Sequence, residues 1–401
     1  MRLFRLAPLF AALALGALPL HAQEPAARKL AQDALIVDTH IDAPGMLTEG
    51  WRDLAIGTDR EFDYPKARAG GLDIAFMSVY TSPTEDAAGT AWDMANRQID
   101  SVLALAARAP DKFAVLTSPG DAAELLAGNR ILLPMGLENA APLGDKLANV
   151  AFFFDRGIRY ITLAHSASNR VSDSSYSDER PWGGLSPFGR EVVAEMNRLG
   201  MMVDVSHLSD AAAAQAIALS TVPVIASHSA FRHFTPGFER NISDELALAL
   251  AVRGGVVQIP FGTAFVNSQA AANLQAKFAG RAALHARNEK AKAEGRPLED
   301  VAAWTAAWEK AHPPPETPIA AVLDQIDHGV RLLGIDHVGI GSDFDGVSGE
   351  LPADLRTVAD FPKLVAGLQQ RGYADADIRK ILGGNLMRVW AAVEAGASRK
   401  G

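Results

Sequence analysis

The sequence predicts an α/β fold that closes into a parallel barrel, and two observations carry this prediction. Short apolar runs recur along the chain, and most are apolar throughout, as in parallel strands buried on both faces. Amphipathic helical patterns separate the runs, and about eight strand-then-helix repeats are typical of a (β/α)8 barrel of the TIM type. The predicted strands are Leu35–Thr39, Ile74–Tyr80, Ile131–Leu137, Tyr160–Leu163, Met202–Val205, Val222–Ala226, Gly255–Phe261 and Val338–Gly341.

A doubly wound open sheet is the alternative fold. A Gly-rich phosphate-binding fingerprint does not follow the first predicted strand, which counts against this alternative. Helical patterns lie between the predicted strands, as the barrel requires. The clearest of them are Ala91–Ala107, Pro187–Leu199, Ser243–Ala251 and Pro318–Leu333.

The segment Ser268–Pro318 breaks the alternation, because it is far too long for a plain connection between a strand and a helix. Its Ala, Lys, Glu and Arg content predicts helix, Trp304 and Trp308 are one helical turn apart, and the run Pro313–Pro315 ends it. We therefore predict a helical insertion after the seventh strand. It is either a helical pair packed outside the barrel, or a lid or dimer contact.

The composition is that of a globular protein with a sizeable core, since 48% of the 401 residues are hydrophobic and 21% are charged. The net charge is -9 and the chain has no basic run, so it offers no electrostatic footprint for nucleic acid or an anionic membrane. The chain contains no cysteine. Disulfides, thiolate metal sites, cysteine nucleophiles and lipidation at cysteine are therefore excluded.

Residues 1–22 have the pattern of a signal peptide. Arg2 and Arg5 precede an apolar run that extends to about residue 20, and small residues follow it. A transmembrane anchor is the alternative, but the apolar run is too short to span a membrane comfortably. We therefore expect a periplasmic or secreted protein with no stable membrane anchor after cleavage. Residues 23–401 are then expected to form one barrel domain.

Histidines and carboxylates follow most of the predicted strands. The carboxyl ends of all strands in such a barrel face one rim, where active sites are built, so residues far apart in the sequence should converge there. The residues concerned are His40, Asp42, Glu138, His165, His207, His228, Asp343 and Asp345.

These side-chain types are those of a zinc-like site, because imidazole and carboxylate suit borderline or harder divalent ions. His40 and Asp42 lie on the same side of an extended segment. The strong candidates are too many for one tetrahedral ion, whereas two ions about 3.5 Å apart would use them and share a carboxylate. Glu138 is the expected bridge, and a water held by both ions would lose its proton near neutral pH.

The other histidines of the ten in the chain have no such placement. His21 lies in the predicted signal peptide, and His337 precedes the eighth strand, at the opposite end of the barrel. His233 lies just past the sixth strand, and no role is assigned to it. The remaining three lie in helical or Pro-rich segments and are expected to have no chemical role: His285, His312 and His328.

These strand ends resemble those of the membrane (renal-type) dipeptidase family, also called peptidase family M19. The resemblance runs in order along nearly the whole mature chain. The matching segments are Asp38–Asp42, Gly136–Glu138, Thr162–Ser166, Asp204–His207, Ser227–Ala230, Arg240–Ile242, Gly339–Gly346 and Gly384–Val389.

The resemblance implies a barrel with two Zn²⁺ per chain and a dipeptide substrate. His40 and Asp42 would hold the first ion, Glu138 would bridge, and His207 and His228 would hold the second. It also suggests a homodimer. Family members of the human type carry cysteines and a C-terminal lipid anchor, and this chain has neither a cysteine nor an apolar tail.

The resemblance further implies that His165 and Arg240 contact the substrate and that Asp343 handles the proton. Arg240 would grip the dipeptide's C-terminal carboxylate. From the residues alone, a surface salt bridge with Glu239 or Asp244 is the alternative.

His165 could stabilise the oxyanion, or could be a third metal ligand or a residue behind the ligands. Asp343 could take a proton from the attacking water and pass it to the leaving amine. Asp345 is its rival, and we expect Asp345 to cap the next helix instead.

The sequence thus predicts a zinc-dependent dipeptidase. Another two-metal barrel hydrolase, of the amidohydrolase type and acting on cyclic amides, lactones or phosphoesters, is the first alternative. Many of those use a modified lysine after the fourth strand, whereas Tyr160–Ser166 contains no lysine and Glu138 supplies a carboxylate instead. An exported binding protein without catalysis is the second alternative, although such a protein would not need a full ligand set together with Asp343.

Overall fold

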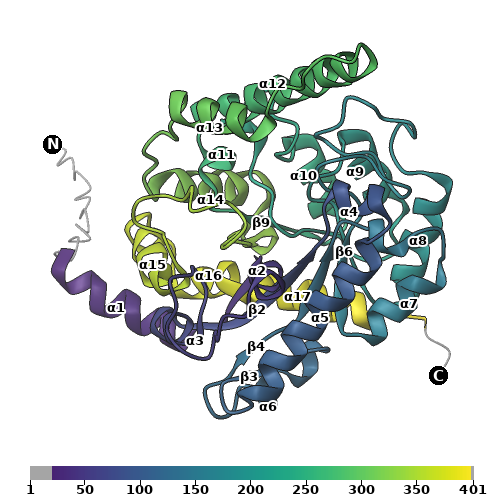
Figure 1. Cartoon of the computed structure of the whole chain (residues 1–401). Coiled ribbons are helices and arrows are strands. Elements are labelled where there is room, and N and C mark those ends of the chain that lie inside the picture. The colour runs from purple at the N-terminus through teal and green to yellow at the C-terminus, as the bar shows by residue number, and fades with distance from the viewer. Residues whose placement is uncertain (1–19, 399–401) are drawn as a thin grey trace, which may run out of the picture.

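In the part of the chain that the structure describes, a sheet of ten strands, all paired in parallel, curls around the centre (Figure 1). The computed structural model describes residues 20–398. Every predicted strand is confirmed, and the short strand β3 is an addition that the sequence did not predict. The strands are β1 (Ile36–Ile41), β2 (Leu72–Tyr80), β3 (Phe113–Ala114), β4 (Ile131–Leu132), β5 (Met135–Glu138), β6 (Ile158–Thr162), β7 (Met202–Asp204), β8 (Ile225–Ala226), β9 (Val256–Ile259) and β10 (Val338–Ile340).

The barrel path runs β1-β2-β5-β6-β7-β8-β9-β10, and its ends meet just beyond β10. There Asp343 N donates to His40 O at 3.1 Å, and Asp42 N donates to Phe344 O at 2.9 Å. The predicted third strand is interrupted at Pro134, which has no N–H to donate, so β4 and β5 form two short pieces. Its carbonyl oxygen still accepts from Met77 N at 2.8 Å, which keeps both pieces along β2.

Helices cover the outside of the barrel and confirm the alternating pattern (Figure 1). Several begin where a serine caps the first turn: Ser186 accepts from Gly189 N, and Ser243 accepts from Leu246 N. The helices are α1 (Leu20–Asp33), α2 (Ala43–Glu49), α3 (Tyr64–Gly70), α4 (Pro83–Ala88), α5 (Ala91–Arg108), α6 (Ala122–Leu125), α7 (Ala148–Asp155), α8 (Pro187–Leu199), α9 (Asp210–Leu219), α10 (Asp244–Val252), α11 (Thr263–Val266), α12 (Ser268–Ala293), α13 (Val301–Ala311), α14 (Ala320–Leu333), α15 (Phe361–Gln370), α16 (Asp375–Arg379) and α17 (Asn385–Ala395).

The predicted helical insertion after the seventh barrel strand is confirmed as helices α12 and α13. Trp304 and Trp308 of α13 stack with ring centroids 5.5 Å apart. A Cβ atom at Gly280 of α12 would lie 2.6 Å from the Trp304 ring, so glycine permits the two helices to pack closely. Lys277 of α12 also pairs with Glu309 of α13 at 2.6 Å.

Residues 1–19 of the predicted signal peptide lie outside the described residues, and α1 begins at Leu20. Between residues 20 and 398, no helix is both long and apolar enough to cross a membrane.

Candidate metal centre at the strand ends

The register of the sheet brings the carboxyl ends of neighbouring strands to one level. Glu138 at the end of β5 pairs with Tyr80 of β2 on one side and with Thr162 of β6 on the other. Thr162 pairs in turn with Asp204 at the end of β7. Residues that follow these strands therefore emerge side by side at one rim of the barrel. We call the resulting group the strand-end cluster: His40, Asp42, Glu138, His165, His207, His228 and Asp343.

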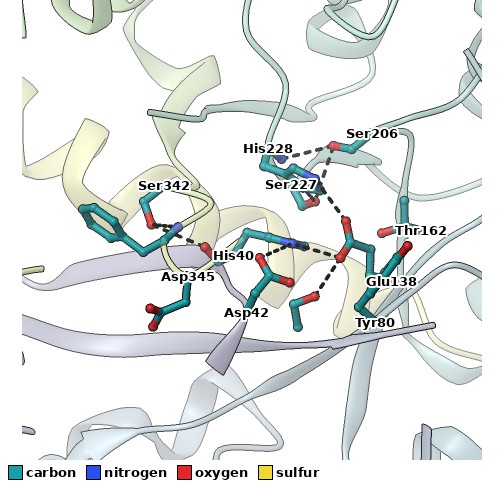
Figure 2. Close-up of polar contacts among 12 residues, drawn as sticks. His40, Asp42, Tyr80, Glu138, Thr162, Ser206, Ser227, His228, Ser342 and Asp345 are labelled. Carbon is teal, nitrogen blue, oxygen red and sulfur yellow. Dashed lines mark hydrogen bonds and ion pairs between the residues drawn. The ribbon is translucent and has the colours of Figure 1, made fainter. Parts of the chain in front are cut away.

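Glu138 lies at the centre of the strand-end cluster. Its Oε2 is 3.3 Å from His40 Nε2, which is itself 3.5 Å from Asp42 Oδ2. Its Oε1 is 3.3 Å from the Nε2 atom of His228, and dashed lines in Figure 2 join Glu138 to both His40 and His228. The same oxygen is 3.2 Å from His207 Nε2. The two oxygens of one carboxylate thus face two different groups of side chains.

His165 lies as close to Glu138 as the two histidines that were predicted to be ligands. Its Nε2 is 3.3 Å from Glu138 Oε1, and its ring centroid is 3.9 Å from that of His207. This position agrees with each alternative for His165: a ligand, a substrate contact, or a residue behind the ligands that donates a hydrogen bond to Glu138.

The donor set fits divalent metal ions. Ligand atoms of a tetrahedral zinc with bonds of about 2.0–2.2 Å lie about 3.3–3.6 Å apart, which matches the separations around Glu138. His40 Nε2 and Asp42 Oδ2 are buried without a hydrogen-bond partner, a costly state unless something else binds them. Burial lowers the pKa of His207 and of His228 well below the usual value, so both imidazoles are neutral, as ligation requires.

Glu138 keeps its charge within this buried cluster. Burial alone would raise its pKa, but the imidazoles of His40 and His165 outweigh burial and hold the pKa of Glu138 well below its usual range. Ser78 Oγ donates to Glu138 Oε2 at 2.9 Å, which helps to fix the orientation of the carboxylate.

Tyr160 orients His40, and the sequence analysis missed this role. The Tyr160 hydroxyl donates to Thr39 O at 3.1 Å and lies 2.9 Å from His40 Nδ1, which must therefore donate to it. Because Nδ1 is committed to Tyr160, Nε2 is the nitrogen of His40 that would bind an ion, and it faces Glu138. A Cβ atom at Gly136 would lie 1.9 Å from the Tyr160 ring, so only glycine leaves room for the ring there.

Ser227 and Asp204 orient His228 in the same way. Ser227 Oγ donates to Asp204 Oδ2 at 2.6 Å and lies 2.7 Å from His228 Nδ1, which donates to it. Thr162 Oγ1 also donates to Asp204 Oδ2, at 2.5 Å. Both Asp204 and Ser227 stand in segments that the sequence analysis quoted, but nothing in the sequence indicated that they contact each other.

Asp343 lies against Asp42 and His40 at the edge of the cluster. Burial and the neighbouring Asp42 carboxylate raise the pKa of Asp343 well above its usual value. Its φ of +65° lies in the left-handed region, which residues other than glycine adopt seldom and Asp more often than most. A Cβ atom at Gly346 would lie 2.2 Å from Asp42 Oδ2 and 2.4 Å from Asp343 Oδ1, so glycine is needed at that position.

The prediction that Asp345 caps the next helix is wrong. Its carboxylate accepts from Glu61 N at 3.0 Å and from Phe62 N at 3.2 Å, and it points away from Glu138 (Figure 2). The chain after β10 does not enter a helix at once, so Asp345 instead ties the rim to the segment before α3.

Arg240 is buried beside the cluster and is not part of a surface salt bridge. It is 2% exposed, while Glu239 pairs with Arg180. Its guanidinium donates to His228 O at 2.8 Å and to Ser229 Oγ at 3.1 Å, and its Nη2 lies 3.0 Å from His207 Nε2.

A cavity of about 380 Å³ opens over the cluster, within the range of small-molecule sites. Glu138, His165, His207 and Asp343 lie along its polar side. Its apolar side chains come from α2, α11, α12 and two loops: Met46, Tyr176, Phe265, Phe278 and Val347. The cavity can therefore hold a small molecule that is polar at its centre and apolar at its periphery.

A parallel barrel with imidazoles and carboxylates gathered at its strand ends is the architecture of the metal-dependent barrel hydrolases. Residues 24–400 match the model of the family "Membrane dipeptidase (Peptidase family M19)". The chain therefore belongs to the membrane dipeptidase family, and its class is that of the dipeptidases.

Named relatives of the chain are dipeptidases. It is 30% identical over 306 residues to dipeptidase tcpJ of Claviceps purpurea, a match that covers 76% of this chain and 61% of that protein. It is 30% identical over 343 residues to dipeptidase aclJ of Aspergillus oryzae, covering 83% of this chain and 70% of that one.

Solved structures share the fold. The probable dipeptidase PvdM from Pseudomonas aeruginosa superposes with a TM-score of 0.82 at 26% identity, over 94% of this chain and 100% of that chain. A metallo peptidase from Rhodobacter sphaeroides, liganded with a phosphinate mimic of the dipeptide L-Ala-D-Ala, superposes with a TM-score of 0.73 at 23% identity, over 90% and 99%.

Proposed function

We propose that this protein hydrolyses the peptide bond of dipeptides with two zinc ions held at the strand ends of the barrel. One observation carries the proposal: Glu138 Oε2 lies 3.3 Å from His40 Nε2, while Glu138 Oε1 lies 3.2 Å from His207 Nε2 and 3.3 Å from His228 Nε2. A shared carboxylate between two ligand groups is the arrangement of a two-metal hydrolase. The bound dipeptide mimic of the Rhodobacter sphaeroides metallo peptidase, which has the same fold, is consistent with the substrate class.

His40 and Asp42 would hold one ion, His207 and His228 the other, and Glu138 both. When bound, the ions would supply Lewis acidity and lower the pKa of the attacking water. The residues of the chain provide the remaining functions.

Asp343 would accept the proton of the attacking water and return it to the leaving amine, because its carboxylate faces the cavity beside Asp42. His165 would stabilise the oxyanion or polarise the scissile carbonyl, since it lines the same cavity.

Arg240 would bind the C-terminal carboxylate of the dipeptide. Its Nε is buried without a hydrogen-bond partner, and its Nη2 is 3.0 Å from His207 Nε2. If His207 Nε2 binds an ion, that Nη2 hydrogen is released. Nε and Nη2 then offer one edge of the guanidinium to a carboxylate, a bidentate geometry.

The test is a hydrolysis assay of the purified, zinc-loaded protein. The panel contains L,L- and L,D-dipeptides, the same dipeptides amidated at the C-terminus, a tripeptide, a cyclic amide and a lactone. We expect cleavage of free dipeptides, loss of activity on chelation, recovery with zinc and about two ions per chain. Faster cleavage of the lactone or cyclic amide would favour the amidohydrolase alternative. Metal binding without any turnover would favour a binding protein.

We also propose that the protein is exported, on the basis of the signal-like residues 1–22. Cell fractionation of a host expressing the full chain should recover a shortened protein outside the cytoplasm. Recovery of the full-length chain in the cytoplasm would contradict export. A homodimer remains a prediction that light scattering of the purified protein can test.

A further inference from the structure

Helix α12 of the insertion reaches the cavity above the strand-end cluster. Phe278, near the middle of α12, lines this cavity together with Tyr176 and Phe265. The insertion was expected to be an outer helical pair, a lid or a dimer contact. Its α12 helix contributes a wall of the site, which agrees with the lid alternative, and Figure 1 shows α12 above the same end of the barrel as α11.

The position of Phe278 is held by contacts at several points along α12. Asn267 caps the helix by accepting from Gln269 N and Ala270 N. Lys277 pairs with Glu309 of α13, Gly280 packs against the Trp304 ring, and Leu284 is fully buried. Because its neighbours in sequence are anchored, Phe278 presents a wall whose position is set by packing.

A chain of aromatic contacts joins Phe278 to Arg240. The Phe278 ring meets the Tyr176 ring edge-on, with centroids 5.0 Å apart. Tyr176 lies in turn 5.9 Å from the His207 ring. Burial raises the pKa of Tyr176 to about 12, while the Arg240 guanidinium beside it acts in the opposite direction. The Arg240 guanidinium carbon is 4.9 Å from the Phe265 ring, so Tyr176 and Phe265 both border the arginine.

We propose that Tyr176, Phe265 and Phe278 form an apolar subsite for the side chain of the second residue of the dipeptide. This inference rests on the proposed function, in which Arg240 binds the carboxylate of that same residue. That side chain and the carboxylate share one α-carbon, so the side chain lies near the rings that border Arg240. Phe278 is 36% exposed in the protein alone, so it has apolar surface left for a ligand to cover. The substrate class is dipeptides with a large apolar second residue, such as Leu or Phe.

The experiment compares kcat/KM for Ala-Ala, Ala-Leu, Ala-Phe and Phe-Ala in the zinc-loaded full chain and in Phe278→Ala. We expect Phe278→Ala to lower kcat/KM for Ala-Leu and Ala-Phe by about tenfold relative to Ala-Ala, chiefly through KM, because apolar contact is removed from the bound state. Phe-Ala should change no more than Ala-Ala. Phe278→Leu should give an intermediate loss.

Phe152 provides a matched control, since it is a phenylalanine of α7 that is 37% exposed and contacts Trp92 away from the cavity. Phe152→Ala should leave the ratio between the four substrates unchanged. An equal loss for all four substrates in Phe278→Ala, or a selective loss for Phe-Ala, would overturn the subsite. Absence of hydrolysis of every dipeptide by the wild-type protein would instead reject the proposed function, so the two failures are distinguishable.

Discussion

The strand-end cluster and a second group contain the same side-chain types, but their imidazoles make different hydrogen bonds. The second group consists of His233, Asp244 and His328. We call the second group the outer cluster, since it lies among α10, α14 and the short turn Arg232–Phe234 on the outside of the barrel. Both contain stacked imidazoles: His40 and His228 have ring centroids 3.7 Å apart, and His233 and His328 have centroids 4.3 Å apart.

The hydrogen bonds of the imidazoles separate the two clusters. In the outer cluster, His328 Nε2 donates to the Asp244 carboxylate at 2.9 and 3.1 Å, so the pair satisfies itself. In the strand-end cluster, His40 and His228 direct Nδ1 to Tyr160 and Ser227, and their Nε2 atoms face Glu138. In His40 and His228, the hydrogen bond made by Nδ1 leaves Nε2 as the nitrogen that could bind a metal, whereas Nε2 of His328 is already paired with Asp244.

Removing the Glu138 carboxylate, which would be shared by both ions, should lower activity more than any other change. We expect Glu138→Ala to lower kcat/KM by at least about 1,000-fold, because metal stabilisation of the reaction is worth several kcal/mol. Elemental analysis should find fewer than two ions per chain. Glu138→Gln is the matched variant, since it keeps the size but not the charge. Full activity in Glu138→Ala would show that this residue does not bridge ions.

Truncating Arg240 should have the next largest effect, and the effect should depend on the substrate. We expect Arg240→Ala to raise KM for free dipeptides on the order of 100-fold, because paired hydrogen bonds to a carboxylate are lost. C-terminally amidated dipeptides should be affected far less. Arg180→Ala, which removes an exposed partner of Glu239, is the control. An equal effect on free and amidated substrates would exclude the carboxylate grip.

Removing the hydroxyl that orients His40 should have a smaller effect. We expect Tyr160→Phe to weaken metal binding about tenfold, because residues that orient ligands typically contribute that much. The ring is buried in a tight contact with Gly136, and phenylalanine preserves that contact. Chelator competition measures the change, and addition of excess zinc should restore turnover. A loss of turnover that zinc does not restore would assign Tyr160 a different role.

Much of the strand-end cluster could be predicted from the sequence, because a barrel brings every strand end to one rim whatever the exact register. The contacts of Tyr160 could not, because they depend on its ring occupying the space over Gly136 in the neighbouring strand. The role of Asp345 was predicted wrongly because its partners, the N–H groups of Glu61 and Phe62, lie far away in the sequence. Phe278 could not be placed because its direction depends on how α12 packs against α13.

Changing the outer cluster should have the smallest effect, and the comparison between the two clusters depends on this result. We expect His328→Gln to leave the number of bound ions and kcat/KM within about twofold of wild type, because the outer pair is already satisfied by its own hydrogen bonds. Asp244 is partly exposed, so the lost pair should lower the unfolding midpoint by only about 2 °C or less.

His228→Gln is the same substitution in the strand-end cluster, and there we expect loss of an ion and of activity. Scanning calorimetry and elemental analysis of both variants measure these differences. If His328→Gln also released an ion, the outer cluster would be a metal site. The hydrogen bonds of the imidazoles would then not explain which of the two clusters binds metal.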